Sequence, residues 1–146
     1  MAIGSDVRTY LMSESSVTTL IGTRCFPDYI PQKNSTFPCI VYTIVSQVGQ
    51  HHLAAGAGFA WTRIQFDCYA ATSLVRWSVA EALRNVLQGF PAAGAAHTMG
   101  SSTVDAVNYE VTRESYEPPQ DNSDTGLFRA SSDYLVRHNQ AAATFA

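Results

Sequence analysis

Charge is scarce in this chain. Asp, Glu, Lys and Arg make up 14% of its 146 residues, whereas about 25% is typical of soluble domains, and Lys33 is its single lysine. The formal net charge is −3 and basic residues form no run, so the chain lacks the cationic surface that holds nucleic-acid phosphates. A largely neutral surface favours association with other proteins instead.

Long apolar segments are absent too. The N-terminus has no basic segment followed by an apolar run, which argues against a signal peptide. No apolar stretch reaches the length of a membrane span, so no membrane partner is expected. The three cysteines are Cys25, Cys39 and Cys68, an odd number at wide spacing, which indicates free thiols in a protein made in the cytoplasm.

Catalytic signatures are also missing. The sequence contains no Gly-x-Ser-x-Gly elbow, Walker loop or Rossmann glycine fingerprint. Cys68 could act as a nucleophile beside His97 or His138, but its place on an apolar strand face favours inert packing. We predict no catalytic residue. A small cytosolic α+β enzyme or ligand-binding domain without a recognisable motif stays open as the alternative, because scattered residues can converge in a fold.

No metal or cofactor site is predicted either. His-Glu-x-x-His and Cys-x-x-Cys motifs are absent. His51 and His52 are the best metal candidates, yet neighbours in an extended chain point to opposite sides. The acidic stretch 117–124 lacks the spaced ligands and closing Glu of a calcium loop. Both stretches are predicted to be solvated loops.

The residues present centre on one strand and one helix. From Phe59 to Ala70 the even positions are small or apolar, so they can face a core. Thr72 or Ser73 can cap a following helix, and Gly89 can end it. The apolar stripe of this helix should pack back onto the even face of the strand. The polar residues of the helix lie mostly off that stripe: Arg76, Glu81, Arg84 and Gln88. The stripe comprises Val75, Val79, Ala82, Leu83, Val86 and Leu87.

The odd face of the same strand combines charges with large aromatic side chains, which is unusual for a solvated face. Arg63 and Asp67 lie four residues apart, about 13 Å, so they cannot pair with each other. Each could pair across strands within the chain or across subunits. Another segment of the chain could also cover this face. We predict a subunit or partner interface there, formed by Phe59, Trp61, Arg63, Asp67 and Tyr69.

Short connections and two small helices complete the N-terminal and middle parts. Ser5 can cap a first amphipathic helix, and Ser16 a second one that Gly22 ends. The loop predicted at 49–58 is rich in small residues, and the Ala- and Gly-rich stretch 91–102 predicts a flexible connection.

Three further stretches favour strands: 39–48, 103–116 and 127–138. In the second, Val107, Tyr109 and Val111 should share one face. A strand of about twelve residues is about 40 Å long, whereas a helix of about eighteen residues spans only about 27 Å. The hairpin ends should therefore project beyond the helix, a shape that favours assembly.

The order of these segments resembles the tail completion proteins of long-tailed bacteriophages, also described as tail terminator or head–tail joining proteins. The resemblance covers about Asp6 to His138. Its most specific part is the strand Gln65–Ala70 followed at once by a helix, and the insert 91–102 departs from the pattern. The matching stretches, after a short N-terminal helix, are LIGTRCFPDYIPQ, FPCIVYTIV, TRIQFDCYA and TGLFRASSDYLVRH.

The resemblance implies an α+β fold with a mainly antiparallel sheet of long strands and helices packed on one face. We expect one such domain at 1–138 and a flexible C-terminal tail at 139–146. It further implies a virion protein without catalytic activity, in a ring usually of six copies that ends the tail tube and docks to the neck or connector. The expected partners are other copies, the tail tube protein and the neck protein. Six copies would carry −18, so DNA can pass the channel without being held.

Overall fold

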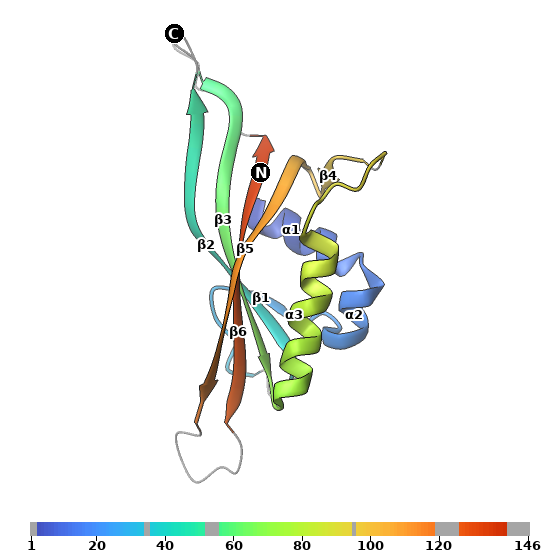
Figure 1. Cartoon of the computed structure of the whole chain (residues 1–146), viewed down its shortest axis with the longest axis vertical. Coiled ribbons are helices and arrows are strands. Elements are labelled where there is room, and N and C mark those ends of the chain that lie inside the picture. Colours follow the sequence, from blue (N-terminus) through green and yellow to red (C-terminus); the bar gives the residue numbers. More distant parts are fainter. Residues whose placement is uncertain (1–2, 34–35, 52–55, 95, 119–125, 140–146) are drawn as a thin grey trace.

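Six strands form one sheet, with three helices on one side of it (Figure 1). The computed structural model describes residues 3–33, 36–51, 56–94, 96–118 and 126–139. The strand order is β1-β2-β3-β6-β5-β4, and only the β1–β2 pair is parallel. The expected α+β fold is therefore confirmed. The strands are β1 (Cys25–Pro27), β2 (Cys39–His51), β3 (Gly56–Ala70), β4 (Thr98–Met99), β5 (Ser102–Glu117) and β6 (Leu127–Asn139).

The core forms where the helices cover β3 and β6. On β3 the even positions Ile64, Phe66 and Cys68 are at most 1% exposed, as their alternation predicts. Helix α3 (Ser73–Leu87) follows β3, and its Val79, Leu83 and Leu87 join the same core. The Thr72 hydroxyl accepts a hydrogen bond from the Val75 N–H, and Gly89 has a φ of 77° just beyond the helix. Both predicted ends of α3 are confirmed.

The long strands extend past the helices at both ends of the molecule. Strand β3 has 15 residues and α3 also has 15, but a strand rises about 3.3 Å per residue and a helix only about 1.5 Å. The β2–β3 pair therefore projects at one end, and the β5–β6 pair projects at the other (Figure 1). The projecting hairpins predicted from strand length are present.

The two N-terminal helices begin earlier than their predicted caps. Helix α1 (Ile3–Met12) already contains Ser5, because its first turn is stabilised by burial of Ile3 and Gly4. Helix α2 (Ser15–Ile21) contains Ser16, and its N-cap Glu14 makes no side-chain capping bond. The predictions that Ser5 and Ser16 are caps are therefore wrong. Gly22, with a φ of 61°, ends α2 as expected.

Strand pairing also replaces parts of two predicted loops. The β2–β3 ladder continues through Gly49 opposite Ala60 and His51 opposite Gly56, so strands occupy both ends of the predicted loop 49–58. The predicted flexible connection 91–102 contains β4, whose Met99 is 1% exposed. Local composition favoured loops here, but backbone pairing and burial of Met99 decide the conformation.

A β-bulge corrects the predicted face of Val111. The register of β5 shifts between Tyr109 and Val111, which places Val111 opposite Asp133 on the side away from the helices, where it is 39% exposed. Thr112 takes the inward place instead and hydrogen-bonds both Tyr109 and Ser132. Alternation along the strand predicts the wrong face here, because the extra residue of the bulge moves each later side chain to the opposite face of the sheet.

Candidate interaction surfaces

The side of the sheet away from the helices is the odd face, which we call the outer face. It carries the predicted interface residues, and ion pairs cross its middle. Asp67 is 5% exposed and accepts hydrogen bonds from Gln65, Ser131 and Arg129, whose guanidinium lies 3.2 Å away. The first proposed role of Asp67, a cross-strand pair within the chain, is therefore present.

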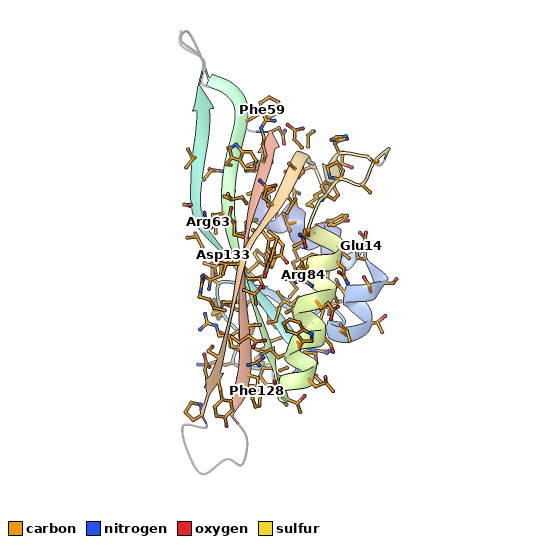
Figure 2. All side chains as sticks on the ribbon, in the orientation of Figure 1. Glu14, Phe59, Arg63, Arg84, Phe128 and Asp133 are labelled. Carbon is orange, nitrogen blue, oxygen red and sulfur yellow. The ribbon has the colours of Figure 1, made fainter. Side chains whose placement is uncertain are left out.

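Arg63 also has a partner within the chain. Figure 2 shows Arg63 beside Asp133 of the neighbouring strand, and its guanidinium lies 3.9 Å from that carboxylate. Arg113 approaches the same carboxylate at 3.3 Å. Arg63 and Asp67 thus belong to two separate ion-pair groups and do not contact each other, as their spacing predicted. The two groups satisfy the buried carboxylates of Asp67 and Asp133 from within the sheet.

The projecting end of the outer face is apolar and more accessible. Phe59 lies under the guanidinium of Arg137, 4.6 Å from its ring centroid, and is placed near this end of the sheet (Figure 2). Trp61 is half-buried, between Val48 on one side and Arg137 on the other. Val48 is 63% exposed. Aromatic rings beside an arginine, partly exposed, have the composition of a protein interface.

Tyr69 lies at the opposite end of the predicted interface, beside Arg129. The guanidinium is 5.7 Å from its ring centroid. Burial raises the pKa of Tyr69, although the nearby positive charge of Arg129 acts in the opposite direction. Asp67 is therefore buried in the sheet, whereas Phe59, Trp61, Arg63 and Tyr69 are all half-buried.

A surface groove of about 380 Å³ runs between α3 and β5. Its walls include Trp77 and Ala80 of α3 and Tyr109 and Thr112 of β5. Trp77 is 49% exposed, and the Arg84 guanidinium lies 5.8 Å from the Tyr109 ring centroid. The sequence prediction missed this groove. Its signal was Trp77, a large aromatic residue placed off the apolar stripe of a surface helix.

Arg76, which pairs with Glu114 of the groove wall, corrects another expectation. It was placed off the buried stripe, yet it is 9% exposed. Its guanidinium donates to the Ser115 carbonyl, pairs with Glu114 at 3.5 Å and lies 5.3 Å from the Phe128 ring centroid. The projecting strands β5 and β6 reach beyond α3 and cover this cation, which helix periodicity alone cannot indicate.

The cysteine chemistry considered from the sequence is not assembled. Cys68 pairs with Ala130 whereas His138 pairs with Ala60, so the two lie eight strand positions apart, about 26 Å. Burial raises the pKa of Cys68, that of Cys25 to about 12 and that of Cys39 to about 11. All three thiols are free and buried, as expected of packing residues. His97 is exposed, and the His138 imidazole hydrogen-bonds Thr62 at 2.6 Å.

Neither predicted solvated loop bears a described metal site. Within the part of the chain that the structure describes, no group of three or more His, Cys, Asp or Glu could hold a metal ion. His52 and most of the stretch 117–124 lie outside the described residues, as does the His51 side chain. Among the helices of the described residues, none is long and apolar enough to cross a membrane.

Comparisons with known proteins agree with this architecture. The family model for tail completion protein gp17 matches residues 5–138. A comparison with curated protein sequences found no match. Among solved structures, a chain from the virion of a native gene transfer agent particle is similar, with a TM-score of 0.65 and 13% identity. The similarity covers 95% of this chain and 92% of that one, and at this identity it establishes the fold.

Proposed function

Because the chain belongs to the tail completion protein gp17 family, we propose that six copies form a ring that ends the tail tube and joins it to the neck. The chain is a structural protein of the phage tail, located in the virion. The family match over residues 5–138 carries the proposal, because it includes every helix and strand of the described residues. Only Ile3 and Gly4 of α1 and Asn139 of β6 lie outside the match.

The physical properties of the chain support a role in assembly. Long strands project at both ends, and the surface carries little charge. A net charge of −3 per copy disfavours tight contact with phosphates, so DNA can pass through the ring without specific binding. We assign the chain no catalytic step, cofactor or metal.

The outer face supplies the proposed subunit or partner interface. Phe59, Trp61, Arg63 and Tyr69 make its half-buried part, and Asp67 lies buried on the same strand in its pair with Arg129. The partners are other copies of this chain, the tail tube protein and the neck or connector protein. An aromatic cluster beside arginine suits a desolvated protein contact better than a ligand site.

Electron microscopy of phage particles tests this function. A reconstruction of the head–tail junction should show this chain as a six-fold ring at the end of the tube nearest the head. Particles that lack the protein should contain separate heads and tails. A single copy per tail, or a position elsewhere in the virion, would contradict the proposal.

A further inference from the structure

Strand β2 forms one edge of the sheet, and most of that edge is open. The short β1 pairs only with Ile40–Tyr42, and the Asp28 N–H extends this contact to the Tyr42 carbonyl. From residue 43 to 51, no other strand of the described residues pairs with this edge. Exposed edge strands invite pairing with another chain.

The open stretch of β2 has few of the features that keep edges apart. Natural edges are protected by charged residues, proline, short length or β-bulges. Residues 43–51, TIVSQVGQH, contain no Asp, Glu, Lys, Arg or Pro, and their irregularities are the register shifts at Ile44/Ser46 and Gly49/His51. Its two valines, Val45 and Val48, are 51% and 63% exposed. A long, uncharged edge with exposed valines is suited to be covered in the assembled protein.

Strand β5 presents a second open stretch near the opposite edge. The segment after α3 closes its first part, because the Val107 N–H donates to the Phe90 carbonyl and the Val104 N–H to the His97 carbonyl. Arg76 occupies the Ser115 carbonyl further along. Between them, residues 108–114 pair with β6 on one side only, as far as the structure is described. The groove beside α3 follows this stretch.

The directions of the strands make the two edges compatible. Each neighbouring pair among β2, β3, β6 and β5 is antiparallel, so β2 and β5 run in opposite directions. When copies stand side by side in the same orientation, β5 of one copy meets β2 of the next in an antiparallel arrangement. Such a head-to-tail contact uses two different surfaces and closes into a ring when the rotation closes.

The two open stretches lie at different heights along the strands, so each copy is displaced in the same direction relative to the copy before it. Val111, at the centre of the β5 stretch, faces outward and lies in the same row across the sheet as Gln65. Paired residues must share a face, so its partner near the centre of the β2 stretch is the outward-facing Val48, whose row contains Trp61. Gln65 and Trp61 lie about four rows apart on β3, so successive copies shift by roughly 13 Å along the strands. A consistent stagger between strands is what a sheet requires to close on itself.

We infer that copies of this chain join by antiparallel pairing of the open stretch of β2 in one copy with residues 108–114 of β5 in the next. The incoming strand lies along the groove, where Trp77 and Ala80 contact its side chains. This inference rests on the proposed ring and specifies the contact that builds it. The outer face then stays available for the tube and neck proteins.

Engineered cysteines test the pairing in assembled particles, since all three native thiols are buried. This pairing places Val48 opposite Val111 of the next copy. The double variant Val48→Cys, Val111→Cys should give, after oxidation, a non-reducing ladder that ends at six chains. Val48→Cys with Tyr116→Cys is the matched control: Tyr116 is 50% exposed but lies outside the open stretch, so cross-linking should be lost.

The outcomes separate the contact from the function. Cross-linked dimers from Val48→Cys alone, at the yield of the double variant, would mean that β2 pairs with itself and overturn the inference. Equal cross-linking in the Tyr116 control would also overturn it. If particles show a six-fold ring but no Val48–Val111 product, the contact is wrong and the function stands. If particles show no ring of this chain, the proposed function itself fails.

A charged edge gives an independent measurement. Val45→Lys should prevent ring formation on tails while the folded subunit keeps its melting temperature, because Val45 is half exposed in the subunit. Tyr29→Lys is the control, since Tyr29 is 71% exposed and lies on neither open edge. Rings that form normally from Val45→Lys would contradict the edge contact.

Discussion

At the scale of single residues, the buried polar groups of this core differ in whether they have a hydrogen-bond partner. Tyr134 is fully buried, and its hydroxyl has no hydrogen-bond partner among the described residues. Its ring packs between Phe66 and Tyr109, with centroids 5.6 and 5.4 Å away. Burial raises the pKa of Tyr134 well above its ordinary value. The ring therefore stabilises the core, whereas the hydroxyl only loses its contact with water.

Replacing this hydroxyl should help the fold. We expect Tyr134→Phe to raise the free energy of unfolding by about 1 kcal/mol, because a buried polar group without a partner costs about 1–3 kcal/mol. Tyr109→Phe is the control: that hydroxyl bonds Thr112 at 2.6 Å, so its removal should cost about 1 kcal/mol. Urea unfolding of both variants measures the difference. A larger loss from Tyr134→Phe than from Tyr109→Phe would show that Tyr134 has a partner.

Elements are tied together by a few polar contacts, of which Asp6 is the clearest. This carboxylate of α1 is 8% exposed and accepts bonds from the Ser101 N–H and from the Ser101 and Ser102 hydroxyls at the start of β5. Gly100 lies so close that an added Cβ would be 2.5 Å from the carboxylate. Its φ of 56° also suits glycine. Helix α1 is thereby fixed to the β4–β5 turn.

The contact predicts an acid-sensitive fold. Burial alone would raise the pKa of Asp6, but the bonds from Ser102 and Ser101 outweigh it and lower the pKa. The unfolded chain therefore binds this proton more tightly, so the stabilisation is present above about pH 4 and is lost as pH falls through the lowered pKa.

Asp6→Asn should cost about 2 kcal/mol at pH 7 and should flatten the fall in stability below pH 4. Asp105→Asn is the comparison, because Asp105 is about one-third exposed in its pair with Arg137 and such pairs contribute at most about 1 kcal/mol. Unfolding curves between pH 2 and 7 provide the measurement. If the loss of stability below pH 4 were unchanged in Asp6→Asn, carboxylates other than Asp6 would be responsible for it.

At the scale of the whole molecule, the sheet separates folding from assembly. Its helix side is a closed core, whereas its outer face and two edges are the surfaces left for other chains. The two ends of the sheet project in opposite directions (Figure 1). One subunit can therefore contact its neighbours sideways and the tube and neck lengthwise.

Two aromatic residues on opposite faces of β3 test this separation. Phe66 is 1% exposed, so Phe66→Ala should cost about 3–5 kcal/mol and lower the melting temperature strongly. Trp61→Ser should change the melting temperature little but should reduce head–tail joining, because Trp61 lies on the proposed interface. Thermal melting and electron microscopy of particles measure the two effects. Equal destabilisation by both changes would make the outer face a second core.

The sequence alone determined what depends on near neighbours in the chain. The alternation of β3 identified its core face, Thr72 and Gly89 marked the ends of α3, and strand length implied projecting hairpins. The order of these segments also indicated the family. Each of these follows from local geometry, because side-chain direction, capping and rise per residue are set within a few residues.

Tertiary structure decided everything that depends on which strands become neighbours. The Tyr109–Val111 bulge moved Val111 to the outer face, and the ladder turned both ends of the predicted loop 49–58 into strand. Burial of Arg76 under β5 and β6, and the groove beside Trp77, required those strands to lie beyond α3. The open edges of β2 and β5 are likewise defined only by the strand order. Such features arise from contacts between segments distant in sequence, and no local pattern encodes them.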